Sequence, residues 1–490
     1  MSLLIKGGEI VDGSGSAPKK CDILVVGNHI AAIGNLASCK ADKVIQALGS
    51  YILPGFIDVA ATSDERLTLF SEPSQADFLK NGVTTIVCGT RGKSLAPAMY
   101  AEETPFLNIG WQTVKDYIKA IRALRLGVNF INVSGYETIR RAITLKSRNL
   151  GIGEIKALSI LLKQCLADGS AGVSIGRGGF ALFDASEDEI NAFTTITSQA
   201  KKTVFTSLKT TDNSHERLME SGSKIIISDL NESLKTQNAF DKFTASAEKN
   251  SLKTEFAFSF SPYPYLECKA SEMFPDTTNL TDATEISKSL SKKRTFAFFS
   301  KKIQELHPQE TFIFNAPRKE TKFLTGKSVA EFAENRKISA EEAFIRIIEI
   351  CGPDTVFISR MANDKIIDKI ITHPKSIVGS SSWSPMSSLS TIHSALSEPF
   401  ITFIRSADNL GMRIEFVAKK LAYPARLLGL KKRGLIKEGF AADIVILKNN
   451  RPEFTIVNGK IAYENGSIVS ALRGTLRNEI SRFGETITVF

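Results

Sequence analysis

Residues 52–59 read ILPGFIDV, an apolar run that is interrupted by a proline–glycine pair and ends next to the carboxylate of Asp58. The stretch separates two kinds of sequence. The residues before it, 1–50, contain short alternating or β-branched runs that end in glycine or asparagine turns. These runs predict strands at 3–5, 23–26 and 30–33. We therefore expect residues 1–50 to form a small β-unit.

The same kind of sequence returns near the C-terminus. Apolar runs at 441–447, 455–457 and 460–463 are separated by the turns Asn458-Gly459 and Asn465-Gly466. Asparagine–glycine pairs between such runs are typical of β-hairpins. We expect residues 431–470 to complete one β-sandwich with residues 1–50.

Between these segments, over residues 51–430, short apolar runs alternate with helix-like segments. Repeated strand–helix alternation favours a parallel sheet covered by helices, and the length fits a (β/α)8 barrel of the TIM type. The expected strand runs are 52–59, 84–88, 128–133, 172–174, 204–207, 224–228, 254–259, 311–314, 355–358 and 376–379. Residues 471–490 are expected to form a tail, either an extra helix and strand or an interaction segment.

Composition and charge argue against several classes of protein. The net charge of +10 is spread along the 490 residues, so we expect no specific nucleic-acid partner. No stretch approaches the roughly 18 to 20 apolar residues of a membrane span, and the N-terminus lacks a signal sequence, so we expect a cytoplasmic protein without membrane contact. The six cysteines lie far apart, which argues against a disulfide framework or a zinc knuckle.

An ordered series of motifs resembles the N-acyl-D-amino-acid deacylases (D-aminoacylases) of the amidohydrolase superfamily. The C-terminal block is the most specific motif, and the series covers nearly the whole chain. The motifs are GGEIVDGSG at 7–15, PGFID at 54–58, GVTTIVCG at 82–89, SLAP at 94–97, GVS at 172–174, YPY at 263–265, HP at 373–374 and PARLLGLKKRGLIKEGFAADIVIL at 424–447.

The resemblance implies a zinc ion at the barrel mouth that activates water against an amide bond. Zinc takes about four ligands from imidazole, thiolate or carboxylate groups. At the positions where the family places its ligands and its general base, this chain has Ala60, Thr62, Arg91, Tyr136, Ser207, Asp229 and Ser381. Asp229 alone among them could bind a metal, so the sequence predicts no metal site and no catalytic residue.

Other residues near the expected mouth leave alternatives open. Arg91 with Lys93 could bind a carboxylate or phosphate, or form a solvated surface pair. Asp64 could pair with Asp229 for acid–base work or to hold a hard cation, or these aspartates could lie at solvated loop ends or pair with Arg91 and Lys209. Tyr263 and Tyr265 could line a ligand pocket or pack at the barrel rim.

Two hypotheses about function follow. In the first, the protein is a catalytically inactive relative of the deacylases that acts as a binding or scaffold protein without a cofactor. In the second, a rebuilt site, with zinc, hydrolyses non-peptide carbon–nitrogen bonds of N-acyl amino acids. Either way, we expect an unknown small molecule or protein as partner, and self-association into a homo-oligomer is compatible with the sequence.

Overall fold

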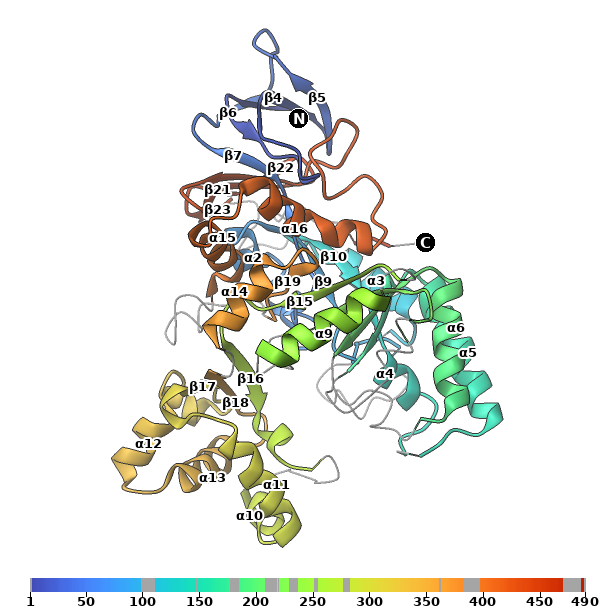
Figure 1. The fold of residues 1–490 in the computed structure, drawn as a ribbon, viewed down its shortest axis with the longest axis vertical. Helices are drawn as coiled ribbons and strands as arrows, with labels where there is room; N and C mark the ends of the chain where they lie inside the picture. The colour runs from blue at the N-terminus through green and yellow to red at the C-terminus, as the bar shows by residue number, and fades with distance from the viewer. Residues whose placement is uncertain are drawn as a thin grey trace.

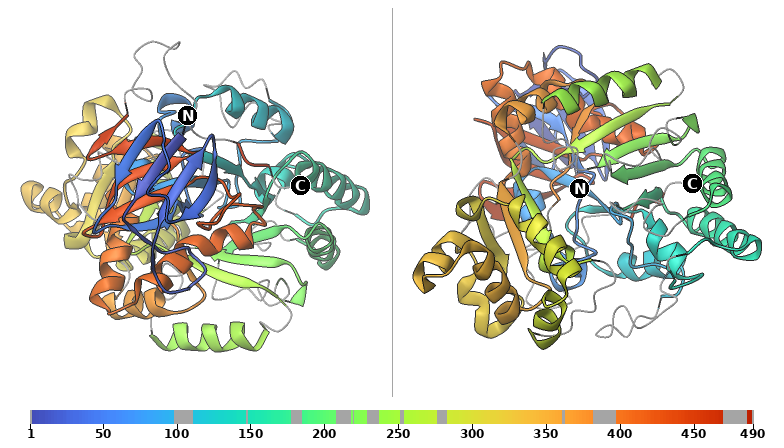
Figure 2. Two further views of the ribbon diagram at one scale, coloured as in Figure 1. Left: turned by 90° about the horizontal axis from the view of Figure 1, so that it is seen from above. Right: turned by 60° about the horizontal axis from the view of Figure 1, so that its bottom comes forward.

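The computed structural model describes residues 2–97, 111–146, 148–176, 185–207, 218, 220–228, 237–250, 254–275, 283–360, 363–381, 397–469 and 486–488. Figure 1 shows a β-domain at the top, a barrel in the middle and a smaller inserted unit at the bottom. Figure 2 gives two further views of the same arrangement.

The β-domain is a sandwich made from both ends of the chain, as the sequence predicted. One sheet has the order β5-β4-β1-β6, and the other has the order β23-β22-β21-β20-β7-β2-β3. Aliphatic side chains of the two sheets, among them Ile5, Ile23 and Ile444, form one buried cluster. The strands are β1 (Ser2–Lys6), β2 (Glu9–Ile10), β3 (Lys19–Lys20), β4 (Asp22–Val26), β5 (His29–Gly34), β6 (Lys43–Gln46), β7 (Tyr51–Pro54), β20 (Ile444–Lys448), β21 (Arg451–Val457), β22 (Lys460–Glu464) and β23 (Ser467–Ile468).

The run 52–59 is two strands, where one was predicted. β7 pairs with β20 in the sandwich, whereas β8 (Phe56–Asp58) pairs with β9 (Val83–Cys88) in the barrel. The chain changes sheets at Gly55, where a β-carbon would lie 2.2 Å from Oγ1 of Thr84. Only glycine permits this close approach of backbone and side chain.

The barrel is of the predicted (β/α)8 type, and all its described strand pairs are parallel. The remaining strands are β10 (Asn129–Asn132), β11 (Ser134–Gly135), β12 (Gly172–Ile175), β13 (Thr203–Ser207), β14 (Lys224–Ser228), β15 (Phe256–Phe260) and β19 (Ser376–Val378). Alternate strand residues such as Ile57, Val87 and Ile226 fill the interior. The opposite strand faces pack against helices.

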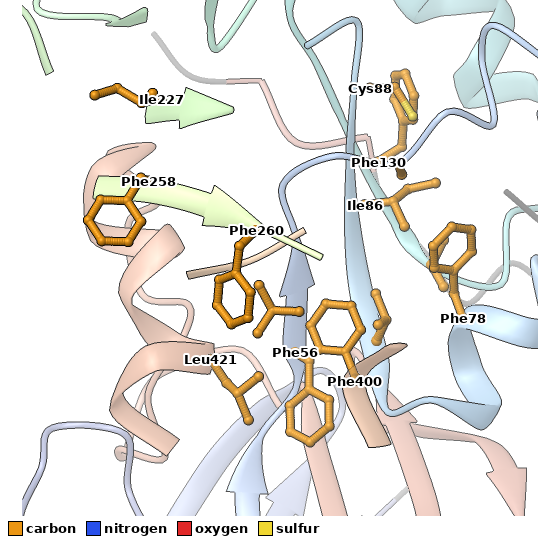
Figure 3. Packing of buried hydrophobic residues seen from close by; sticks show 14 of the residues in the cluster. Phe56, Phe78, Ile86, Cys88, Phe130, Ile227, Phe258, Phe260, Phe400 and Leu421 are labelled. Carbon is orange, nitrogen blue, oxygen red and sulfur yellow. The ribbon is translucent and has the colours of Figure 1, made fainter. Parts of the chain in front are cut away.

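The surrounding helices are α1 (Thr68–Ser71), α2 (Ala76–Lys80), α3 (Val114–Ala123), α4 (Tyr136–Arg141), α5 (Ile152–Ala167), α6 (Glu187–Gln199), α9 (Gln237–Asn250), α14 (Asp364–Thr372), α15 (Pro399–Asn409) and α16 (Ile414–Leu427). Their contact with the strands combines aliphatic and aromatic side chains. Phe56 of β8 stacks on Phe400 of α15 with ring centroids 5.8 Å apart (Figure 3). Phe260 of β15 meets Phe403 edge to face. Such pairs anchor α15 to both ends of the barrel strands, since Phe56 begins β8 and Phe260 ends β15.

Two predicted barrel strands, 311–314 and 355–358, belong to another sheet, so this part of the prediction was wrong. They lie in an antiparallel sheet of order β16-β18-β17, inserted between β15 and β19. With its helices the insertion has its own core, centred on Phe299, Phe344 and Phe357. Its elements are β16 (Tyr265–Lys269), η3 (Ala270–Met273), α10 (Ala283–Leu290), α11 (Lys293–Gln304), η4 (Pro308–Glu310), β17 (Thr311–Asn315), η5 (Lys319–Leu324), α12 (Val329–Arg336), α13 (Ala340–Cys351) and β18 (Val356–Arg360).

The floor of the barrel is closed by chain segments from the C-terminal half. The end of α16, including Leu427, packs into the interior cluster, and Ile487 packs against the same cluster. The Ile487 amide donates to the Phe130 carbonyl at 2.8 Å, so this part of the tail lies beside β10. Within the described ranges, no helix combines the length and apolar character that a bilayer crossing requires.

Candidate functional site at the barrel mouth

In parallel barrels, functional groups lie where the carboxyl ends of the strands meet. The first such end here is β8. Asp58 is fully buried, and its Oδ1 accepts hydrogen bonds from the amides of Ala60 and Ser380, each at 3.0 Å. Its Oδ2 accepts from the Ser380 hydroxyl. Burial raises the pKa of Asp58, while the bonds from Ser380 and the charge of Arg91 oppose that rise. Asp58 therefore fastens β8 to the segment after β19.

Ala60 and Thr62 follow β8 at the positions expected for two metal ligands, and both are 2% exposed. A β-carbon on Gly379 would lie 2.8 Å from the Ala60 methyl, so the two segments touch here without polar groups. The Thr62 hydroxyl is buried, and no hydrogen-bond partner is found for it in the described part of the chain. Neither side chain offers zinc a nitrogen, thiolate or carboxylate ligand.

Arg91 lies on a loop after β9 that is held tightly in place. The Gly92 amide donates to Oγ of Ser174 at 2.9 Å, and that hydroxyl donates to the Gly89 carbonyl at 2.6 Å. A β-carbon on Gly92 would come within 2.3 Å of the Gly176 nitrogen. The backbone of the Arg91 loop is thus fixed against β12 and the segment after it.

The side chain of Arg91 is half-buried, whereas Lys93 is exposed. Burial raises the pKa of Glu267 on β16, and the positive charges of Arg66 and Arg91 oppose the rise. Glu267 forms an ion pair with Arg66 at 3.3 Å, with each side chain 18% exposed. Because Arg91 acts electrostatically on both Asp58 and Glu267, its charge is placed between the barrel and the inserted sheet.

Asp64 is buried, at 2% exposed, so the expectation of a solvated loop end was wrong for this residue. Burial, reinforced by the charge of Glu65, raises the pKa of Asp64 to about 7. The Cys88 thiol is its hydrogen-bonding neighbour, and burial with the nearby Asp64 charge raises the pKa of that thiol. Cys88 and Tyr117 of α3 both belong to the cluster between the strands and the helices, so Asp64 faces the helical layer.

Tyr136, the first residue of α4, also packs among helices. Its ring meets Phe193 of α6 edge to face at 5.5 Å, and its hydroxyl donates to Glu189. Arg140 pairs with the same carboxylate at 2.8 Å, and both partners are fully buried. Burial and the charge of Glu189 raise the pKa of Tyr136, so the phenol stays protonated.

The remaining predicted site residues take varied positions. The Tyr263 hydroxyl donates to the Ser380 carbonyl at 2.9 Å, and Tyr265 begins β16 opposite Arg360. Ser381 is half-buried and follows Ser380 directly. Ser207 ends β13 opposite Ser228, and Asp229 lies outside the described residues.

These groups do not fit a zinc ion. No cluster of three or more histidine, cysteine, aspartate or glutamate side chains that could hold a metal occurs among the described residues. The two positions after β8 supply a methyl and a hydroxyl, and the loop after β9 supplies a guanidinium. These side chains are not suitable zinc ligands. The fixed positive charge of Arg91 also opposes cation binding, so both features argue against zinc.

The sequence did not reveal three of the contacts: Ser380 with Asp58, Glu267 with Arg66, and Cys88 with Asp64. Each joins residues separated by 24 to 322 positions along the chain. The signals available were a carboxylate directly after a strand and a serine cluster at 380–382, and neither indicates a partner.

The TIM-type barrel and the β-sandwich from both chain ends resemble the amidohydrolase fold, while the positions expected for metal ligands carry other residues. No family model matches the chain. It is 25% identical over 466 residues to the N-acyl-D-aspartate deacylase of Alcaligenes xylosoxydans xylosoxydans, covering 90% of this chain and 85% of that protein. It is 32% identical over 182 residues to a D-aminoacylase of the same organism, which covers 36% of this chain and only 37% of that protein.

A solved structure agrees on the fold. The N-acyl-D-glutamate deacylase of Bordetella bronchiseptica, complexed with zinc and a phosphonate inhibitor, matches with a TM-score of 0.75 at 20% identity over 99% of each chain. The chain is thus a homologue of the D-aminoacylases within the amidohydrolase superfamily, with degenerate metal-ligand motifs.

Proposed function

We propose that this protein has lost the hydrolase activity of its relatives and acts as a binding or scaffold protein that works without a metal. The observation that carries the proposal is the combination of Ala60, Thr62 and Arg91 at the mouth. The first two side chains cannot bind zinc usefully, and the third brings a positive charge on a rigid loop.

The charge of Arg91 opposes metal binding by an amount that Coulomb's law bounds. Two unit charges 4 Å apart interact by about 4 kcal/mol at the effective dielectric constant typical of sites near a protein surface. A divalent ion beside a guanidinium meets about twice that repulsion, which is comparable to a large share of a metal's binding free energy. Two acidic residues of the mouth are engaged in other contacts: Asp58 accepts from Ser380 and Ala60, and Glu267 pairs with Arg66.

A rebuilt hydrolase would need carboxylates gathered at the mouth. Asp58 is used in fastening β8, and Asp64 lies beside Cys88 and near Tyr117 in the helical layer. These contacts favour the binding function over the hydrolytic one. General acid–base catalysis requires a group within hydrogen-bond reach of the reacting atom.

The test is a hydrolysis assay with N-acyl-D-aspartate and N-acyl-D-glutamate in the presence of zinc. A deacylase with intact ligands serves as the positive control. We expect no release of D-amino acid above the rate without protein. Zinc-dependent release by the unaltered chain would contradict the proposal.

A gain-of-function variant sharpens the assay. Ala60→His/Thr62→His/Arg91→Cys supplies two imidazoles and a thiol and removes the positive charge. We expect this variant to retain zinc more strongly than the unaltered chain, whereas Ala60→His/Thr62→His with Arg91 retained should bind little. Equal zinc affinity of the two variants would show that Arg91 does not oppose the metal.

A further inference from the structure

The inserted unit contains a helix, α11, that is more basic than the other helices of the unit, α10, α12 and α13. Its sequence, KRTFAFFSKKIQ, contains four basic residues and no acidic one. Figure 1 shows α10 and α11 at the lower extremity of the molecule, on the side away from the sandwich. The view in Figure 2 with the bottom turned forward brings this unit toward the reader.

The inner face of α11 is already used. Thr295, Phe299 and Ile303 are buried, and Phe299 and Ile303 belong to the core of the insertion. The Ser300 hydroxyl donates to Glu341 of α13, which fixes the rotation of the helix. The outer face is therefore presented in one defined orientation.

That outer face carries Arg294, Ala297, Phe298 and Lys301, all exposed, at the i, i+3, i+4 and i+7 spacing of one helix stripe. We call these four residues the α11 stripe. Phe298 is 39% exposed, and the ammonium of Lys302 lies 5.9 Å from its ring centroid. An aromatic side chain flanked by arginine and lysine is a composition typical of binding surfaces, where such residues act as anchors.

The cations of the stripe are not neutralised by their own surroundings. Within the described part of the chain, neither Arg294 nor Lys301 has an acidic partner. By contrast, basic residues elsewhere on the insertion form ion pairs, such as Lys288 with Glu285 and Lys327 with Glu331. The stripe thus carries positive charge that no described acidic group neutralises.

We propose that the α11 stripe is a docking surface for an acidic protein segment, whose carboxylates meet Arg294 and Lys301 and whose apolar side chains cover Ala297 and Phe298. The proposal deepens the scaffold function proposed above by naming a surface and a kind of partner. A membrane is disfavoured because the apolar face of α11 is turned inward. Nucleic acid is disfavoured because the two exposed rings of α11, Phe296 and Phe298, are two residues apart on the helix and do not face each other, so they form no continuous stacking surface.

The experiment measures binding of the full chain, at physiological salt, to a fluorescent amphipathic helix built from glutamate and leucine. Single-stranded oligouridine and vesicles of phosphatidylcholine with phosphatidylserine are the competing probes. We expect the acidic peptide to bind most tightly. Arg294→Glu/Lys301→Glu should weaken it at least about tenfold, and Phe298→Ala about three- to tenfold.

The matched control is Lys156→Glu/Lys163→Glu, which makes the same charge change on the exposed face of α5, where Ile152 and Ile160 are also exposed. It should leave binding unchanged. Equal loss in both double variants, no binding of the peptide, or tighter binding of oligouridine or vesicles would overturn the proposal. Hydrolysis of N-acyl-D-amino acids by the unaltered chain would contradict the proposed function and leave this binding result intact.

Discussion

The floor and the mouth of the barrel are built from the same strands, but they treat buried polar groups differently. At the floor, Asn129, Arg433, Asp443 and Asn458 bond to one another across the barrel and the sandwich. At the mouth, the hydroxyls of Thr62 and Ser228 are buried without a hydrogen bond in the described part of the chain. At the floor, the Thr486 hydroxyl beside Phe130 is in the same state.

This difference distinguishes the residues at the floor, which stabilise the fold, from those at the mouth, which is the functional end of the barrel. Buried polar groups usually find partners, and each exception calls for an explanation, of which a functional role is one. The floor network holds the two domains together, so its residues are needed whatever the protein does. The mouth retains the polar character of a site while its metal-binding groups are absent from the positions after β8 and β9.

The largest effect is expected at the floor. Arg433→Ala leaves the buried Asp443 carboxylate without its ion pair and Asn458 without a donor. We expect the free energy of unfolding to fall by about 3–5 kcal/mol, because an uncompensated charge stays buried. Urea unfolding followed by circular dichroism measures the change.

The control for this prediction is Arg451→Ala, which breaks the pair with Glu398, where the two side chains are 52% and 27% exposed. Solvent already screens that pair, so a loss of about 0–1 kcal/mol is expected. Equal losses in the two variants would show that the floor network has no special role.

An intermediate effect is expected at Asp64. Its pKa is about 7 in the folded protein and about 4 when unfolded, so the folded state holds the proton more tightly. Stability from this group is fully present below about pH 4 and is lost as pH rises to about 7. Asp64→Asn should remove this loss and stabilise the protein by about 2–4 kcal/mol at and above neutral pH.

The measurement is the free energy of unfolding of the variant minus that of the unaltered chain, between about pH 5 and pH 8. The difference should grow with pH and then level off. Asp188→Asn, at an exposed position on α6, is the control and should show no such trend. A flat difference for Asp64→Asn would mean that its carboxyl is not held in a protonated form.

The smallest effect is expected when either of two buried threonines, Thr203 at the floor or Thr62 at the mouth, is replaced by valine. The Thr203 hydroxyl at the floor donates to the Leu427 carbonyl at 2.7 Å, whereas the Thr62 hydroxyl at the mouth has no described partner. Thr203→Val should cost about 1–2 kcal/mol, and Thr62→Val should be neutral or stabilising by up to about 1 kcal/mol. Thermal unfolding of both variants measures these changes in stability. A clear loss of stability in Thr62→Val would indicate that the Thr62 hydroxyl has a partner in solution.

The architecture was predictable from the sequence because hydrophobic periodicity and turns are local signals. They identified the sandwich from both ends and the alternation of strands and helices. They failed to assign strands to sheets. The runs 311–314 and 355–358 look like barrel strands but pair antiparallel in the insertion, and residues 52–59 divide between two sheets at Gly55.

The geometry of the site was much less predictable than the fold. That Ala60, Thr62 and Arg91 stand where the family has its metal ligands stays a prediction. The sequence did not show that Asp64 is buried beside Cys88, or that Tyr136 pairs with Glu189 in the helical layer. Such contacts join distant segments, and only the packed fold brings them together.

The central claim is that the mouth cannot hold the metal on which the relatives' chemistry rests. The most direct measurement is the zinc content of the purified full chain after incubation with zinc and dialysis, by elemental mass spectrometry, with a D-aminoacylase of intact ligands as control. We predict no retained zinc in this protein and stoichiometric zinc in the control. Stoichiometric zinc in both would contradict the account.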